Sequence, residues 1–283
     1  MKKSLLVTLA LSLVLVAAGC SKTTENTTEE VATEVEDATE AVEEDAAEAE
    51  DTAEAETETE ADTENAAAEG VMSYADYVAA AVDTEVCVET YVQAKQAWWE
   101  DNGVGQATFY TQNQDGAFFV YNLPCSQEDY DKLVPGTKIK VTGFKSEWSG
   151  EVEITDATYE IEDTDTFVAD AKDVTDLLGK DELIDYQNQF VSFKGMTVEA
   201  ANDAGDAFLY KWDGSGTEGD DLYFNVSLDG NTYTFTVESY LCDKDSDVYK
   251  AVQNLKVGDV VDMEGFLYWY EGVNPHITSV SVQ

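Results

Sequence analysis

Residues 135–155 read PGTKIKVTGFKSEWSGEVEIT, and residues 257–278 read VGDVVDMEGFLYWYEGVNPHIT. In each segment three glycines follow one another at intervals of seven, the middle glycine precedes a Phe, and Ile-Thr comes near the end. The two middle glycines, Gly143 and Gly265, lie 122 residues apart. A spacing that recurs in this way predicts two copies of one structural unit.

The agreement extends upstream of both segments. Asp115-Gly116 and Asp229-Gly230 each lie between stretches in which polar and apolar residues alternate. A short Asp-Gly turn between two such stretches predicts a β-hairpin. Cys125 and Cys242 then occupy equivalent places after the hairpins, ahead of a helix-like segment.

Each unit therefore has five strand patterns and one helix pattern, in the order β-β-β-α-β-β. In the first unit Ser126 and Asp129 predict the helix start, and Pro135 its stop. Expected strands of the first unit are residues 86–94, 108–113, 117–122, 138–144 and 151–161, with the helix at 126–133. Those of the second are residues 190–199, 222–228, 233–240, 260–268 and 277–282, with the helix at 246–255.

This order, with the helix between strands three and four, resembles the OB fold, a five-stranded Greek-key barrel. The chain is similar to surface lipoproteins of Gram-positive bacteria that carry tandem OB-type domains. The resemblance implies a mainly β protein with one barrel in residues 71–165 and a second in residues 166–283. Short helices at residues 73–82 and 174–186 are expected to precede the barrels.

The first twenty residues predict where the protein resides. Lys2 and Lys3 precede an apolar run at residues 5–16, which is shorter than the roughly 20 residues that a membrane-spanning helix needs. The following Ala17-Ala18-Gly19-Cys20 resembles a bacterial lipobox, although its first position lacks the preferred Leu. The resemblance implies removal of residues 1–19 and lipid attachment to Cys20, which places the protein on the extracytoplasmic face of the cell membrane. The alternative is an ordinary secreted protein whose Cys20 is accidental.

Residues 20–70 are expected to form a disordered acidic tether. Between residues 23 and 70 there are 20 acidic residues, no basic residue and no aromatic residue. Such a segment buries too little apolar surface to offset the entropy of ordering.

The whole chain is also acidic, with 60 acidic residues, 15 basic residues and a formal net charge of -45. All the basic residues are Lys, and apart from the adjacent Lys2 and Lys3 they are scattered singly. Because this field repels phosphate backbones, the sequence predicts no nucleic-acid partner and favours sugars, cations or basic proteins.

Catalysis is not expected. His276 is the only histidine, and its place in an expected loop is typical of a solvated or turn residue. No metal motif includes Cys87, Cys125 and Cys242, and a bridge between Cys87 and Cys125 is left open by the sequence.

The main candidates for ligand contact are aromatic residues near two loops of each unit. One loop joins the first and second strands, and the other joins the fourth and fifth. OB folds bind oligonucleotides and oligosaccharides with these loops. The hypothesis is a glycan, from the cell wall or the diet, or a basic peptide; the alternative is that the rings cap the barrel ends. The candidates are Trp98, Trp99, Tyr110, Trp148, Tyr210, Trp212, Trp269 and Tyr270.

The long first loop of the second unit is a weaker candidate for a Ca²⁺ site, because it is rich in carboxylates. These are Asp203, Asp206, Asp213, Asp220 and Asp221. No other cofactor is expected. The sequence thus predicts a lipid-anchored binding module; the alternatives are a structural wall-associated or protein-binding lipoprotein without a small ligand, and an enzyme of unrecognised type. The oligomeric state is left open.

Overall fold

The computed structural model describes residues 70–283, which belong to one compact unit. The predicted signal peptide, Cys20 and the tether up to residue 69 lie outside the described residues. Within residues 70–283, no helix has the length and apolar character needed to cross a membrane.

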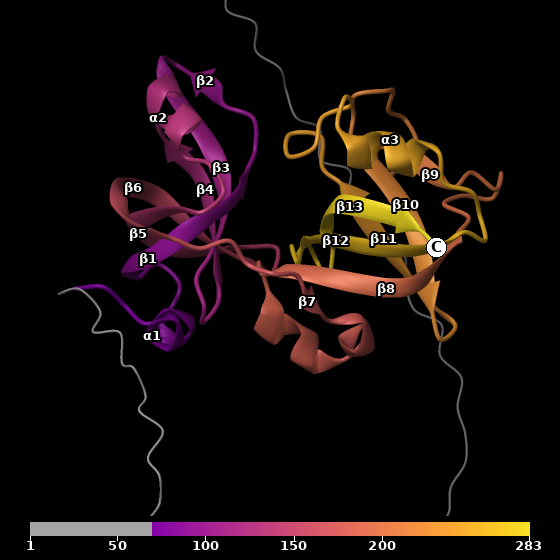
Figure 1. Ribbon diagram of the computed structural model, residues 1–283, viewed down its shortest axis with the longest axis horizontal. Helices are drawn as coiled ribbons and strands as arrows, with labels where there is room; N and C mark the ends of the chain where they lie inside the picture. Colours follow the sequence, from indigo (N-terminus) through magenta and orange to yellow (C-terminus); the bar gives the residue numbers. More distant parts are fainter. Residues whose placement is uncertain (1–69) are drawn as a thin grey trace, which may run out of the picture. The chain divides into compact units, whose positions relative to one another are not determined.

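The first sheet closes into a barrel (Figure 1). Its strands are β1 (Glu85–Lys95), β2 (Trp99–Asp101), β3 (Val104–Gln112), β4 (Ala117–Pro124), β5 (Thr137–Trp148) and β6 (Glu151–Thr166). The strand order is β1-β5-β6-β4-β3, and β3 pairs back onto β1 to close the barrel. Strands β4 and β6 are parallel, and the other pairs are antiparallel. With α2 (Gln127–Lys132) between β4 and β5, this is the topology of an OB fold, as predicted.

The second sheet repeats this topology. Its elements are β7 (Lys172–Asp173), β8 (Phe190–Glu199), β9 (Phe208–Tyr210), β10 (Leu222–Leu228), β11 (Asn231–Val237), α3 (Asp247–Gln253), β12 (Val260–Phe266) and β13 (His276–Val282). Strand β8 pairs with β10 to close the barrel, and β11 and β13 are parallel, as are the short β7 and β8. The protein is therefore mainly β, with two OB barrels in tandem.

The repeated glycines mark places where the backbones come close. The pairing of β5 with β6 is irregular at Gly143, and that of β12 with β13 is irregular at Gly265. A Cβ atom on Gly265 would lie 2.2 Å from the carbonyl oxygen of His276, and one on Gly143 would lie 2.8 Å from that of Thr155. Only glycine fits these two bulges, which explains why the motif recurs.

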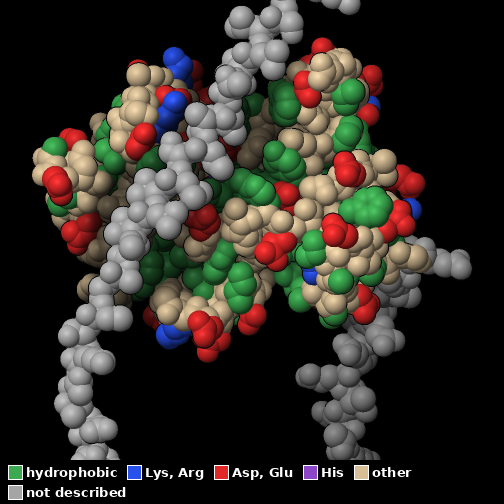
Figure 2. Space-filling view, turned by 180° about the vertical axis from the view of Figure 1, so that it is seen from behind, with side chains coloured by type: hydrophobic (Ala, Val, Ile, Leu, Met, Phe, Trp, Pro, Cys, Tyr) green, Lys and Arg blue, Asp and Glu red, His purple; other side chains and the backbone are tan. Residues whose placement is uncertain are grey.

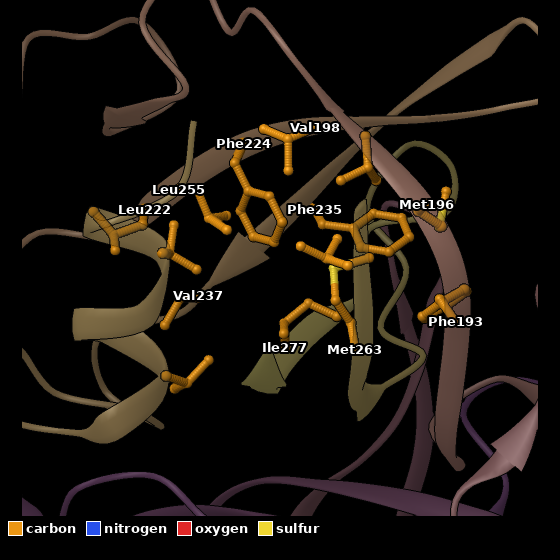
Figure 3. Close-up of a cluster of buried hydrophobic side chains, with 14 of the residues drawn as sticks. Phe193, Met196, Val198, Leu222, Phe224, Phe235, Val237, Leu255, Met263 and Ile277 are labelled. Atoms are coloured by element: carbon orange, nitrogen blue, oxygen red, sulfur yellow. The ribbon is translucent and has the colours of Figure 1, made fainter. Parts of the chain in front are cut away.

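Each barrel has its own apolar core. In β1 the alternating residues Val86, Val88 and Val92 are buried, as the period-two pattern predicts. Figure 3 shows the second core, where side chains from all five barrel strands, such as Phe224, Phe235 and Met263, point toward one another.

The predicted helix starts are confirmed where a Ser precedes the helix. The Ser73 hydroxyl accepts a hydrogen bond from the Asp76 amide at the start of α1 (Tyr74–Ala79), and Ser126 does the same for Asp129. The single helix expected at residues 174–186 is wrong, because Gly179 adopts a positive φ of 78°. The chain forms two short 3-10 helices instead, η1 (Thr175–Leu177) and η2 (Asp181–Tyr186).

A third apolar cluster joins the two sheets. Tyr110 of β3, Phe119 of β4 and Phe266 of β12 are all buried in it, and the Tyr110 and Phe266 rings stack with centroids 4.4 Å apart. Residues 107–112 are consequently buried on both faces of β3, one face toward the barrel core and the other toward the second sheet. The face that β3 and β4 form on the first barrel is thus largely covered by the second sheet.

Candidate functional site

A cavity of about 650 Å³ remains on the part of this face that is not covered. Aromatic side chains predominate in its lining, and the amides of Gln96 and Asn122 add hydrogen-bonding groups. Its size is that of a small-ligand site. The lining residues are Gln96, Ala97, Trp98, Trp99, Phe119, Tyr121, Asn122, Glu238, Tyr240, Tyr268 and His276.

The segment between β1 and β3, which contains β2, brings two of the predicted residues to this cavity. The Trp98 indole Nε1 donates to the carbonyl oxygen of Cys125 at 3.0 Å, and its ring lies against Gly105, where a Cβ would be 2.2 Å away. Trp98 is therefore fixed by the barrel. Trp99 is 45% exposed and has more freedom to contact a ligand.

The second sheet supplies the opposite wall. The Ala97 amide donates to the carbonyl oxygen of Tyr240 at 2.8 Å, which ties this wall to the loop that carries the tryptophans. The Tyr268 ring stacks on His276 with centroids 4.2 Å apart, and its edge meets Phe119 at 5.4 Å. Rings from both sheets therefore surround one cavity.

His276 is not the solvated loop residue that the sequence predicted. It begins β13, is buried, and its Nδ1 lies 2.6 Å from the Tyr110 hydroxyl oxygen. Burial lowers the pKa of His276 to about 3, so the imidazole is neutral at physiological pH. His276 is buried because the second sheet packs on β3, and the sequence pattern of a single unit gives no sign of that packing.

Glu238 is the one acidic residue in the cavity lining, and none of the lining residues is Lys. One of its carboxyl oxygens accepts from the Tyr240 amide at 3.0 Å, and the other has no hydrogen-bond partner among the described residues. Burial raises the pKa of Glu238 to about 7, and the nearby Asp221 carboxylate contributes to the rise.

Tyr110 is a correction among the predicted ligand contacts. Its side chain has no exposed surface, and it is held by Phe119, Phe266 and His276. Tyr110 packs behind residues that line the cavity, and a ligand in the cavity cannot reach it.

The other predicted aromatics lie outside this cavity. The Trp148 ring packs at a tilt of 37° against Tyr270, with centroids 5.0 Å apart. Tyr270 and Trp212 line a separate cavity of about 390 Å³ on the second barrel. Trp212 is 76% exposed. Trp269 packs against the second core, and the Tyr210 hydroxyl accepts from the Gln253 amide at 2.9 Å. The eight candidates therefore do not form one site.

The five aspartates of the long loop do not gather either. In the part of the chain that the structure describes, no group of three or more His, Cys, Asp or Glu side chains could hold a metal ion. Asp221 accepts from the amide and hydroxyl of Ser239, and Asp213 accepts from the Ser215 amide. Asp206 and Asp220 make similar short-range bonds, with Asn202 and Thr217. Asp203 lies exposed in the same loop.

The three described cysteines are free thiols, so the bridge between Cys87 and Cys125 that the sequence left open is not formed. Cys125 belongs to the first core, and burial raises its pKa to about 11. A thiol with so high a pKa is a poor nucleophile.

Sequence reasoning missed most of the cavity wall, namely Phe119, Tyr121, Glu238, Tyr240 and Tyr268. One signal was available in β4. Phe118, Phe119 and Val120 are consecutive apolar residues, which breaks the alternation of a half-buried strand and indicates a strand covered on both faces.

No family model and no curated protein matches this chain. Several solved structures do align with this chain. A murine DNA-binding protein bound with double-stranded DNA aligns with 70% of this chain and 94% of its own, at 11% identity and a TM-score of 0.33. The Ifi202 HINa domain in complex with 20-base-pair double-stranded DNA aligns with 71% and 96%, at 12% identity and 0.31. A replication protein A heterotrimer bound to single-stranded DNA aligns with 70% and 49%, at 13% identity and 0.30.

These comparisons correct one prediction. Net charge led to the expectation that nucleic acid would not be a partner, and that exclusion is wrong because structures similar to this chain are DNA complexes. Figure 2 shows the acidic side chains spread over one face of the molecule with few lysines among them.

Proposed function

We propose that the protein is a lipid-anchored, extracytoplasmic binding protein that holds a glycan in the aromatic cavity on the first barrel. The observation that carries this proposal is the cavity lining, in which six aromatic rings of Trp98, Trp99, Phe119, Tyr121, Tyr240 and Tyr268 combine with two amides and one carboxyl group. Flat rings accept the apolar faces of sugar rings, and amide and carboxyl groups accept or donate to hydroxyls. The role is binding rather than catalysis.

The position of the cavity supports the same proposal. It lies over β4 and beside the segment that follows β1, which belong to the face and loop with which OB folds hold oligosaccharides and oligonucleotides. Tyr240 and Trp99 are 69% and 45% exposed, so rings are open to a ligand at the cavity mouth.

Replacing Trp99 by Ala tests the site. Oligosaccharides of cell-wall and plant origin are titrated while tryptophan fluorescence and heat are recorded, and binding is expected to weaken roughly tenfold in the variant through loss of ring stacking. Trp212→Ala removes a more exposed indole outside the cavity and should leave the affinity unchanged. Single-stranded DNA is titrated in parallel. No response to any glycan, or tight binding of DNA alone, would overturn the proposal.

The membrane anchor is tested separately through Cys20, which lies outside the described residues. If Cys20 is acylated, the wild-type protein partitions with the membrane fraction of the producing bacterium, and Cys20→Ser moves it to the aqueous fraction. The same distribution for both proteins would show that Cys20 carries no lipid.

A further inference from the structure

The aromatic cavity contains a charge that a neutral sugar does not need. Glu238 is only 8% exposed, follows directly after β11, and leaves one carboxyl oxygen without a hydrogen-bond partner among the described residues. A buried carboxyl group in this state is costly, because it has lost water and one of its two oxygens has gained no donor in return. Such a group is stabilised when a ligand brings a positive charge near it.

The remaining lining suits the same kind of ligand. Aromatic faces attract a cation electrostatically, and the attraction grows when the cation is shielded from water. His276 is held neutral by burial and none of the lining residues is Lys, so nothing in the lining repels a cation. The cavity therefore combines an aromatic cage with a single buried carboxyl group.

We infer that the preferred ligand of this cavity is a glycan with a free ammonium group, an amino sugar whose cation sits among the aromatic rings near Glu238. This inference rests on the proposed function and narrows it to a substrate class. Neutral and N-acetylated sugars can use the rings and amides, but they leave the carboxyl group without its counter-charge.

A matched ligand series tests the inference. Oligomers of glucosamine, of N-acetylglucosamine and of glucose have similar ring size and differ at the 2-substituent. Calorimetric titration at neutral pH therefore separates the effect of ligand charge on affinity from the effect of ligand shape. The glucosamine oligomer is expected to bind at least tenfold more tightly than the other two. The gain should shrink as salt rises, because part of it is electrostatic.

Glu238→Gln removes the charge and retains an oxygen that can accept from the Tyr240 amide. We expect this variant to lose the preference, binding the glucosamine oligomer about tenfold more weakly than the wild type and the glucose oligomer within twofold. Glu271→Gln changes the net charge equally at an exposed loop position and should retain the preference.

Each outcome is decisive. If the three oligomers bind the wild type equally, or if Glu238→Gln retains the preference, the amino-sugar inference is overturned while glycan binding stands. If no oligomer binds, the proposed function itself fails. A lysine-rich peptide that binds where the sugars do not would assign the cage to a protein partner and overturn both.

Discussion

A protein in which Tyr110 is replaced by Ala is expected to lose about 3–5 kcal/mol of unfolding free energy, the range for removing a fully buried aromatic side chain. Tyr110 has no exposed surface and lies at the centre of the cluster that joins the two sheets. Its ring touches Phe119 from its own barrel and Phe266 from the other. The loss therefore falls on the contact between the barrels rather than on either core.

That location predicts a particular shape for the unfolding curve. Each barrel has a core of its own, so weakening the joining cluster should split a single urea transition into two, one for each barrel. Tyr110→Phe is the control, because it retains the ring and removes only the hydroxyl that faces His276 Nδ1. It should cost about 1 kcal/mol and leave one transition. If Tyr110→Ala unfolded like Tyr110→Phe, the joining cluster would not couple the barrels.

The OB topology could be predicted from the sequence because it depends on local patterns that repeat. The alternation in β1, the Ser126 cap and the Asp229-Gly230 turn each concern residues close in the chain, and the structure confirms all three. The recurring glycines could also be recognised, since the same steric need arises at Gly143 and Gly265.

The site could be predicted only in part, for a physical reason. Trp98 and Trp99 were found because their loop belongs to one barrel. The positions of Tyr110, Glu238 and His276 depend on how one barrel packs on the other, and no periodicity within a single unit encodes that packing.

Packing between the barrels also buries the carboxyl group of Glu151. Replacing Glu151 by Gln is expected to stabilise the protein at alkaline pH by an amount on the order of 4 kcal/mol. Glu151 begins β6 and is fully buried. One of its oxygens accepts from the Trp269 amide at 2.9 Å and from the Gln187 side chain at 3.3 Å, and the other has no partner among the described residues. Burial raises the pKa of Glu151 from 4.5 to about 8.

The direction of the effect follows from proton binding. Folding raises the pKa of Glu151, so the folded protein binds more protons than the unfolded chain between about pH 4.5 and pH 8. The contribution of Glu151 to the unfolding free energy therefore falls as pH rises through this window and levels off above it. There the ionised carboxylate costs about 1.4 kcal/mol for each unit by which burial raises its pKa. Glu153 and Glu238, whose pKa values are each raised to about 7, add to the same slope.

Gln at position 151 removes the ionisation and retains an oxygen for the Trp269 amide. Its new amide group can also donate to Asn188, which lies beside the carboxyl group and whose Oδ1 lacks a partner among the described residues. Urea unfolding of the wild type and Glu151→Gln should therefore give curves that diverge from pH 5 to pH 9, the variant being the flatter and more stable. Glu147→Gln, exposed at the end of β5, should follow the wild type at every pH. Parallel curves for wild type and Glu151→Gln would show that Glu151 is ionised in the folded protein without cost.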